Sequence, residues 1–355
     1  MPVFDTVFPA DSLEFCPTAG SQNIFVCGTY KLLDQPPVPG NSTDSSKVPQ
    51  KRIGQCLAFE VHSSEEGDVQ FEKIHSFDLP AIPDMKWCHR SSTIPLLAVA
   101  NSEGFITLHE WRERSFQEVD SIRCASSDTL CLSLDWSNRR TGGSTGSLVV
   151  SLSNGSLCLL TPSETSSLSV TETWHAHDYE PWVAAWNYWD SNVIYSGGDD
   201  LQMKGWDIRQ GFDRPTFINK RFEAGVTCIQ SHPHIEHLIA VGSYNETVQL
   251  FDARKMNNSV AQAEIGGGAW RVKWHPSEAR KRDLLVACMH DGFKILQFDE
   301  NENGGLHNPQ TVKRFDEHES MAYGADWSFA PPLRDDGSIA AGCSFYDHKL
   351  SVWKV

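Results

Sequence analysis

The sequence has no long apolar run, and its opening stretch, MPVFDTVFPADSLEF, carries acidic side chains where a secretory leader would carry basic ones. A membrane helix needs about 18 consecutive apolar residues, so none is expected here. The ten cysteines stand singly, without a C-x-x-C pair, which argues against a zinc ribbon or a thioredoxin-type site. We therefore expect a cytoplasmic protein with reduced thiols, no membrane contact, no metal ion and no cofactor.

Basic residues are also scarce. Lys and Arg number 30 against 46 Asp and Glu, which gives a formal net charge of -16. Proteins that bind nucleic acid without sequence preference depend on Lys and Arg contacts to phosphates, so this charge balance argues against a nucleic-acid partner. A cationic or basic partner fits better, and the chain is expected to act as a monomer.

What the sequence does have is a repeated pattern. A short strand-like segment that ends at a large residue recurs, and two apolar strands joined by a tight polar turn follow each copy. A more divergent copy, with the segments DSLEFCP, NIFVCGTY and GQCLAFEV, opens the chain and brings the number of copies to seven. In the other six copies the end of the first segment is marked by Trp87, Trp136, Trp186, Ser231, Trp274 and Trp327.

Seven copies of a four-stranded unit that cannot bury both faces alone are typical of a β-propeller. The segments KGWDIR and LFDAR resemble those of the WD-repeat family. We therefore predict an all-β fold, a seven-bladed WD-repeat β-propeller that occupies residues 1–355 as a single domain with a flexible loop insertion at 34–50. The last copy stops after its third strand, so Pro2 to Phe8 is expected to supply the missing outer strand and close the ring.

Two segments suggest chemistry of their own. GGSTG, Gly142 to Gly146, matches a nucleophile elbow, but it lies in a connector between strands and no helix is expected to follow it. In HAHDYE, two histidines one residue apart stand beside carboxylates, and metal binding or catalysis is conceivable there. The structural alternative is a hydrogen bond from His177 to Asp199 or Asp200, as WD repeats commonly have.

An alignment of the copies brings out further candidates. His177 and His318 both stand nine residues before their strand-ending Trp, and an aromatic residue stands four places before it at Trp182, Trp270 and Tyr323. Side-chain alternation along a strand puts these aromatic residues on the same side as the strand-ending Trp, near one mouth of the central channel. The turns expected around that mouth would add Asp84, Asp128, Glu180, Asp199, Asp200, Glu246, His290, Asp291, Tyr346 and Asp347.

Aromatic faces surrounded by carboxylates form the kind of surface that holds a quaternary or methylated ammonium group. The structural alternative is packing of large aromatic rings between blades. Both interpretations predict that the three aromatic side chains lie close together in space.

Several segments resemble a particular family more closely than the generic repeat does. HAHDYEPWVAAWNYWDSNVIYSGGDDLQMKGWDIR, GGGAWRVKWHPSE, LLVACMHDGFKIL and HESMAYGADW are similar to the diphthine methyl ester hydrolase family, also called diphthine methyltransferase, over about residues 170 to 355. The resemblance implies a carboxylic ester hydrolase that demethylates methylated diphthine on translation elongation factor 2 during diphthamide biosynthesis. Diphthine carries a trimethylammonium group, which suits the aromatic and acidic surface.

Ester hydrolysis needs an activated nucleophile or water and stabilisation of an oxyanion. We expect a water molecule or Ser320 to be activated by His318 or His290, with Asp291, Glu319 or Asp178 orienting the base; His177 is a further candidate. The substrate-binding residues are expected to be Glu180, Trp182, Asp199, Trp270 and Tyr323.

The competing interpretation is a non-enzymatic interaction scaffold, since WD-repeat propellers often only bind partners. WDIR (Trp206 to Arg209) and FDAR (Phe251 to Arg254) also resemble the signature of ubiquitin-ligase substrate receptors, which bind a ligase adaptor. A structural alternative exists for these segments too, because each Arg could pair with a carboxylate of its own blade.

Overall fold

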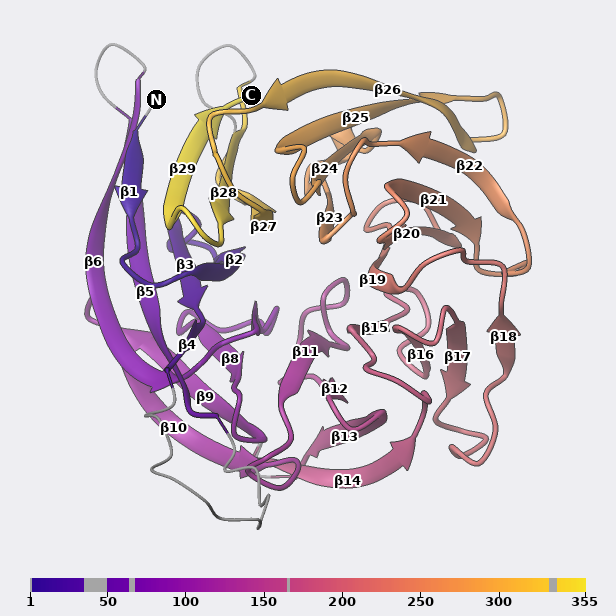
Figure 1. Cartoon of the computed structure of the whole chain (residues 1–355), viewed down its shortest axis with the longest axis horizontal. Coiled ribbons are helices and arrows are strands. Elements are labelled where there is room, and N and C mark those ends of the chain that lie inside the picture. Colours follow the sequence, from indigo (N-terminus) through magenta and orange to yellow (C-terminus); the bar gives the residue numbers. More distant parts are fainter. Residues whose placement is uncertain (1, 35–49, 64–67, 165–166, 332–336) are drawn as a thin grey trace, which may run out of the picture.

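Seven antiparallel sheets stand around a common axis in a computed structural model of the chain (Figure 1). The structure describes residues 2–34, 50–63, 68–164, 167–331 and 337–355. Six sheets have four strands and one has five, and each sheet is one blade of a propeller. The predicted all-β, seven-bladed fold is therefore confirmed. Most of the expected loop at 34–50 lies outside the described residues.

Each blade runs outward from a short innermost strand, and consecutive strands pair antiparallel. The strands of the first three blades are β2 (Ala10–Phe15), β3 (Ile24–Thr29), β4 (Lys31–Leu32), β5 (Arg52–Ser63) and β6 (Val69–Pro80); β7 (Asp84–Trp87), β8 (Leu96–Ala100), β9 (Phe105–Arg112) and β10 (Ser115–Arg123); β11 (Cys131–Trp136), β12 (Leu148–Leu152), β13 (Ser156–Pro162) and β14 (Leu168–His175).

The other four blades follow the same plan, and the last one takes its outer strand from the N-terminal end of the chain. Their strands are β15 (Val183–Trp186), β16 (Val193–Gly197), β17 (Met203–Asp207) and β18 (Phe217–Asn219); β19 (Val226–Ser231), β20 (Leu238–Ser243), β21 (Thr247–Asp252) and β22 (Ser259–Glu264); β23 (Arg271–Trp274), β24 (Asp283–Ala287), β25 (Phe293–Glu300) and β26 (Leu306–Phe315); β27 (Ala322–Trp327), β28 (Ile339–Ser344), β29 (Lys349–Lys354) and β1 (Val3–Asp5).

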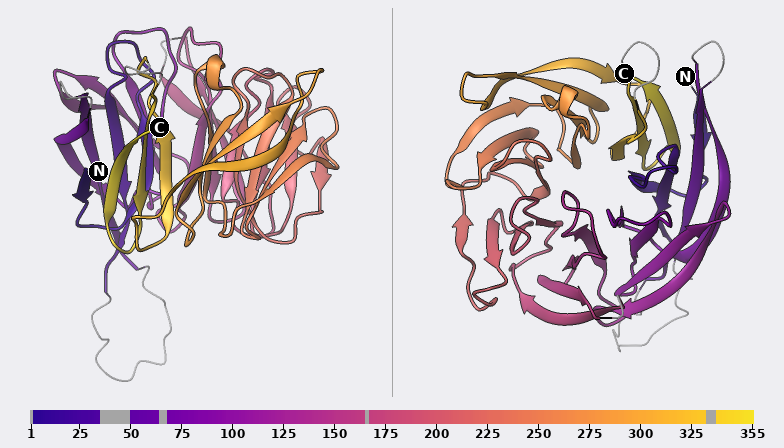
Figure 2. Two further views of the ribbon diagram at one scale, coloured as in Figure 1. Left: turned by 90° about the horizontal axis from the view of Figure 1, so that it is seen from above. Right: turned by 180° about the vertical axis from the view of Figure 1, so that it is seen from behind.

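The ring is closed by pairing between the two ends of the chain, as the sequence predicts. β1 runs antiparallel to β29, with Val3 opposite Ser351 and Asp5 opposite Lys349. The amide of Thr6 then donates a hydrogen bond to the carbonyl oxygen of His348 at 2.9 Å. The two termini lie near each other at the same edge of the ring (Figure 2). An edge strand that would otherwise be unpaired is thereby covered.

The apolar core is divided among the seven junctions between neighbouring blades. Each of seven clusters of buried side chains combines residues from two adjacent blades, such as Val149 with Trp186, or Leu285 with Trp327. A sheet that is apolar on both faces cannot stand alone, so each blade depends on its neighbours for burial.

The repeated Trp has a second use besides filling these junctions. The indole Nε1 of Trp136 donates a hydrogen bond to the carbonyl oxygen of Lys86 in the preceding blade at 2.9 Å. Trp186 and Trp327 make the same bond to Asp135 at 3.1 Å and to Lys273 at 2.8 Å. Where Ser231 takes the place of Trp, its hydroxyl still donates to the carbonyl oxygen of the preceding blade, at Trp186. The sequence period therefore reflects a contact that recurs at several blade junctions, although Trp274 Nε1 has no such partner among the described residues.

Helical structure is nearly absent from the parts of the chain that the structure describes. The helical element there is η1 (Glu278–Arg280), a single 3₁₀ turn. Within the described ranges no helix has the length and apolar character that crossing a membrane would require.

Candidate active site

One mouth of the channel holds a cavity of about 190 Å³, at the ends where the innermost strands begin. We call the residues that line it the aromatic mouth. They are Asp11, Tyr30, Pro83, Leu130, Leu132, Trp182, Trp270, Arg271, Tyr323 and Phe345.

Six of these residues occupy the same position in six blades, four places before the residue that ends the innermost strand. They are Asp11, Pro83, Leu132, Trp182, Trp270 and Tyr323. The sequence prediction that Trp182, Trp270 and Tyr323 gather at one mouth is therefore confirmed.

The reason given for that gathering needs a correction. Strict alternation would put these side chains on the side of the strand-ending Trp, which packs between blades. In four blades the ladder shifts register at this position, for example between Ala10 and Ser12 and between Ala322 and Ala325. Trp182 and Trp270 instead lie just before β15 and β23 begin. A β-bulge re-aims the side chain that it carries, which is how these residues reach the cavity.

The aromatic rings form a continuous wall. The Trp270 ring stacks on Tyr323, with 4.7 Å between centroids and 25° between planes. Trp182 follows on one side, 5.6 Å from Trp270, and Phe345 on the other, 5.3 Å from Tyr323. The Tyr30 ring extends the wall 6.3 Å beyond Phe345. Such tilted and stacked pairs are favourable arrangements that hold ring faces in fixed directions.

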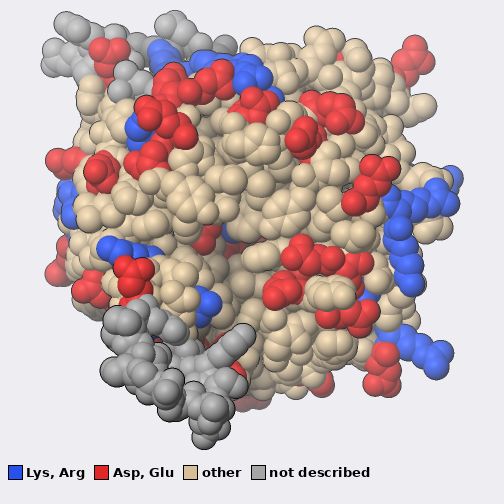
Figure 3. Space-filling model, viewed as in Figure 1, with Lys and Arg blue, Asp and Glu red and all other residues tan. Residues whose placement is uncertain are grey.

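Acidic residues surround this wall, although fewer than the sequence suggests. Glu180 and Glu246 are exposed and Asp199 is half-buried. Burial raises the pKa of Asp199; the Trp182 indole lowers it, and the carboxylates of Glu180 and Asp200 raise it further. Figure 3 looks onto this face and shows acidic side chains at several places around a central hollow.

Three of the acids expected at the mouth point elsewhere. Asp84 is buried and binds Lys86 Nζ at 2.5 Å. Asp200 is held inside its blade, and Asp347 accepts a hydrogen bond from the Glu319 amide at 2.8 Å. Asp84 thus pairs with a lysine, and Asp200 and Asp347 are held by hydrogen bonds within their blades. Of the remaining expected turn residues, Asp128 and Tyr346 are exposed.

The carboxyl group of Asp11 is the most unusual polar group of the mouth. Asp11 is only 7% exposed, and its Oδ1 atom has no hydrogen-bond partner among the described residues. Burial raises the pKa of Asp11 to about 7, with Arg271 opposing the rise and Asp84 adding to it. Perturbed carboxyl groups of this kind are frequent at functional sites.

Asp11 is absent from the residues predicted above, although the sequence contains a signal for it. Asp11 stands four places before Phe15, which ends β2 in the place where most other blades have Trp. The alignment that finds Trp182, Trp270 and Tyr323 therefore finds Asp11 as well, once Phe15 is accepted in the position of that Trp.

Two of the predicted histidines are engaged in hydrogen bonds inside their blades. His177 is buried, with Nδ1 2.9 Å from Asp200 Oδ1 and Nε2 2.7 Å from Ser196 Oγ. The Trp206 indole donates to the same Ser196 hydroxyl at 2.9 Å. Of the two carboxylates proposed as its partner, Asp200 is the one bound, and this arrangement is the structural alternative that the sequence suggests.

His318 has a similar environment in the last blade. Its Nδ1 lies 2.6 Å from Ser344 Oγ and its Nε2 lies 2.9 Å from Ser351 Oγ. Burial lowers the pKa of His318 to about 4, so the ring is neutral at physiological pH. Both ring nitrogens are occupied, and the role of His318 as a base stays a prediction.

The other catalytic candidates are spread over the rim. Ser320 Oγ accepts a hydrogen bond from the Tyr346 amide at 2.8 Å. Asp291 pairs with Arg314 at 2.8 Å and with Lys294, and Glu319 pairs with Lys349 at 3.0 Å. His290 is exposed, with Nε2 4.0 Å from Glu246. Asp178 is exposed, with its carboxylate 4.0 Å from His175 Nε2. Their catalytic roles also stay predictions.

GGSTG does not form an elbow. The amide of Gly143 donates to Ser91 Oγ, the carbonyl oxygen of Ser144 accepts from Asn138, and the described chain continues into β12 rather than into a helix. This matches the objection raised from its sequence context.

A layer of buried charges lies below the aromatic mouth. Lys86 Nζ is 2.7 Å from Glu14, and Lys273 pairs with Glu14 and with Asp326, the latter at 3.5 Å. Arg139 is 2.5 Å from Asp135. These residues stand just before or just after the ends of the innermost strands, and each basic side chain pairs with an acidic one.

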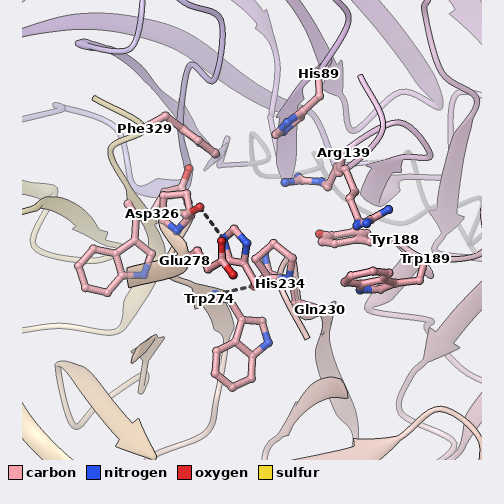
Figure 4. Close-up of a pocket in the computed structure, with 14 residues that line it drawn as sticks. His89, Arg139, Tyr188, Trp189, Gln230, His234, Trp274, Glu278, Asp326 and Phe329 are labelled. Atoms are coloured by element: carbon pink, nitrogen blue, oxygen red, sulfur yellow. Dashed lines mark hydrogen bonds between the residues drawn. The ribbon is translucent and has the colours of Figure 1, made fainter. Parts of the chain in front are cut away.

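The opposite mouth holds a larger cavity of about 570 Å³ (Figure 4). Its lining includes two arginines, and the guanidinium group of Arg140 lies 3.6 Å from the centre of the Trp189 ring. Desolvation lowers the pKa of His89 in this cavity to about 3. Its wall holds Arg139 and Arg140 together with Glu278 and Asp326, and the aromatic mouth likewise holds an arginine, Arg271, and a carboxyl group, Asp11.

The two arginines of the ligase-like segments pair within their own turns. Arg209 forms two hydrogen bonds with Asp207, at 2.8 and 2.7 Å, and Arg254 does the same with Asp252, at 2.9 and 2.6 Å. These pairs are the structural alternative for WDIR and FDAR. Both arginine side chains remain more than half exposed.

Comparison with known proteins gives consistent matches over most of the chain. The sequence is 40% identical to diphthine methyltransferase of Mus musculus, covering 92% of this chain and 68% of that protein. It is 38% identical to diphthine methyltransferase of Homo sapiens, covering 92% and 74%. A diphthine methyltransferase homolog of Dictyostelium discoideum is 33% identical, covering 98% and 96%.

The fold has a counterpart among solved structures. A chain from the crystal structure of the mitotic checkpoint complex superposes with a TM-score of 0.70 at 16% identity, covering 100% of this chain and 93% of that chain. At this identity the match concerns the fold alone. No family model matches the sequence.

Proposed function

The chain belongs to the diphthine methyltransferase family, and we propose that it hydrolyses the methyl ester of methylated diphthine on translation elongation factor 2. In this proposal residues 1–355 act as one propeller domain, a cytoplasmic monomer that needs no cofactor. The protein substrate inserts its modified side chain into the aromatic mouth.

The observation that carries the proposal is an aromatic wall in a cavity that Asp11 also lines, with the carboxylates of Glu180 and Asp199 beside Trp182. Trp182, Trp270 and Tyr323 present ring faces that attract a trimethylammonium group, and Trp binds cations best among aromatic residues. Glu180 and Asp199 add negative charge at the rim, close to Trp182. A quaternary ammonium group cannot donate hydrogen bonds, so ring faces and diffuse negative charge are the means by which a protein can hold it.

The location at a channel mouth also suits a substrate that is itself a protein. The cavity opens toward the turns between strands, which a folded partner can approach.

The same site must also supply a base. Among the bases expected from the sequence, His290 is exposed, whereas both ring nitrogens of His318 are hydrogen-bonded. His290 therefore remains the sequence-derived base that a substrate can reach most easily, with Glu246 as its carboxylate neighbour.

Methanol release tests the proposal. The purified chain alone is incubated with elongation factor 2 that carries methylated diphthine, and methanol and the loss of the methyl group from the modified peptide are measured. Release that depends on the chain supports the esterase. If the chain releases no methanol but captures a ligase adaptor through Arg209 and Arg254, the scaffold interpretation replaces it.

A further inference from the structure

We propose that Asp11 is the catalytic general base of the aromatic mouth and that it activates the water molecule which attacks the ester carbonyl. The inference rests on the esterase function proposed above and names the group that performs it. No sequence motif and no comparison assigns a role to Asp11.

The position of Asp11 within the cavity supports this role. Asp11 lies at the register shift of β2 between Ala10 and Ser12, so the bulge turns its side chain into the cavity instead of into the ladder. It occupies the same place in its blade as Trp182, Trp270 and Tyr323 do in theirs. A ligand that rests on the aromatic wall therefore has the Asp11 carboxyl group at the same depth of the channel.

The bonding state of Asp11 is unusual for a buried carboxyl group. Buried polar atoms in folded proteins almost always have a hydrogen-bond partner, yet Asp11 Oδ1 has none among the described residues. Leaving such an atom unsatisfied is costly unless a ligand or a water molecule completes it. Other buried acids of the channel, Glu14 and Asp84, are paired with lysines instead.

The groups around Asp11 keep its pKa near physiological pH, so both protonation states are accessible. The groups that face it are a cation at Arg271, an anion at Asp84, the Trp270 indole, and neutral hydroxyl and thiol groups from its own and other blades. They are Arg271, Asp84, Trp270, Cys27, Tyr30, Tyr244 and Tyr323. With burial as the main cause, the pKa of Asp11 is about 7, which is suitable for a general base at physiological pH.

Donors for the oxyanion are also present at this level of the channel. The indole Nε1 atoms of Trp182 and Trp270 are buried without a hydrogen bond of normal geometry in the described chain, and they lie close enough to the carboxyl groups of Asp199 and Asp11 to lower the pKa of each. Buried N–H donors that are held only weakly in this way can stabilise negative charge as it develops on a carbonyl oxygen. The two tryptophans that face the ammonium group thus also offer N–H groups to the ester.

The reaction then proceeds in two steps. The Asp11 carboxylate takes a proton from water while the water oxygen bonds to the ester carbon, which forms a tetrahedral oxyanion. The bond from this carbon to the methoxy oxygen then breaks, and the protonated Asp11 gives its proton to the departing methoxide. Methanol leaves, the carboxylic acid product loses its proton to solvent, and Asp11 is again a carboxylate. No covalent enzyme intermediate is needed.

The test compares Asp11→Asn with wild type and with Glu278→Gln, an exposed carboxylate that lines the opposite cavity. For Asp11→Asn we expect kcat for methanol release from methylated elongation factor 2 to fall by about 10²- to 10⁴-fold. Binding of tetramethylammonium chloride, followed by tryptophan fluorescence, should change by less than about tenfold, since the aromatic wall remains. Glu278→Gln should retain wild-type kcat.

Two results would contradict the role of Asp11 as general base without contradicting the proposed esterase function. One is a folded Asp11→Asn protein whose kcat is within about fivefold of wild type, far from the effect of a lost base. The other needs no variant: a wild-type kcat/KM that is flat from about pH 5 to 9 excludes a base with the pKa of Asp11. Absence of methanol release by wild type would instead contradict the proposed function itself.

Discussion

The Trp270 ring stacks on the Tyr323 ring at 4.7 Å; Trp270 directly precedes the innermost strand of its blade, and Tyr323 lies in the innermost strand of the next blade. Neither blade alone could present two stacked rings at one depth of the channel. The contact exists because the propeller repeats one strand position around a closed ring, and it produces a surface for a cation out of residues that are distant in sequence.

Removal of the Trp270 side chain should weaken substrate binding and also slow the chemical step. We expect Trp270→Ala to raise KM for methylated elongation factor 2 by about 5- to 30-fold, from loss of roughly 1–2 kcal/mol of cation–π attraction. Its kcat should fall as well, because the indole N–H offered to the oxyanion is lost. Trp270→Phe, which keeps a ring without that N–H, should recover KM more than kcat. Steady-state methanol release measures both parameters.

Trp189→Ala is the matched control for this substitution. Trp189 lies in the opposite cavity, where its Nε1 donates to the carbonyl oxygen of His232 at 2.9 Å. Its removal should leave KM unchanged. If Trp189→Ala raises KM and Trp270→Ala does not, the substrate binds at the opposite mouth.

Asp11 should reduce the stability of the protein as pH rises. Its pKa is about 7 in the folded protein, above the value of an unfolded Asp near 3.9, so the folded state binds the proton more tightly. The stabilisation from proton binding to Asp11 is fully present below about pH 4 and is lost as pH rises through 7. The total loss is about 1.4 kcal/mol for each unit by which the folded and unfolded pKa values differ. Asp11→Asn lacks this pH-dependent loss of stability. The urea midpoint of Asp11→Asn minus that of wild type should therefore be larger at pH 8 than at pH 4.

This comparison has a clear negative outcome. Other buried acids such as Asp326 also titrate, but they are common to both proteins and cancel in the difference. A difference in unfolding free energy between wild type and Asp11→Asn that does not vary with pH would show that Asp11 titrates normally.

The histidine and serine candidates from the sequence separate into structural and accessible groups. His318→Ala should lower unfolding free energy by roughly 2 kcal/mol, because it leaves Ser344 and Ser351 without their buried partner. Its kcat below the melting transition should stay near wild type, and the same holds for Ser320→Ala. Circular dichroism and methanol release test this. A folded His318→Ala protein with kcat reduced by about 100-fold would support His318 as the general base.

Deletion of residues 1–9 removes the strand that closes the ring. Three residue pairs between β1 and β29 and the bond from Thr6 to His348 are lost, and the outer edge of the last blade becomes unpaired. We expect a sharp drop in melting temperature in calorimetry. An unchanged melting curve would mean that the ring does not depend on β1.

The sequence was sufficient for the fold because the same contact recurs. The Trp that ends each innermost strand binds the preceding blade in the same way at Trp136, Trp186 and Trp327, so its spacing could be read without a structure. The aromatic wall could be predicted for the same reason, since Trp182, Trp270 and Tyr323 stand at a fixed distance from that residue.

The electrostatics of the site could not be predicted in this way. Asp84 and Asp200 look like mouth residues in an alignment, but Lys86 draws one inward and His177 holds the other in its blade. Asp11 escaped notice because Phe15 replaces Trp, and because the bulge that turns its side chain into the cavity leaves no trace in the residue pattern.

The central claim is that this propeller is an ester hydrolase that works at its aromatic mouth, and methanol release tests it most directly. Purified wild-type chain is mixed with elongation factor 2 bearing methylated diphthine, alone and with excess tetramethylammonium chloride. We predict one methanol per ester, with a rate that tetramethylammonium lowers by competition. No methanol from folded protein, or a rate that the cation leaves untouched at saturating concentration, would contradict the account.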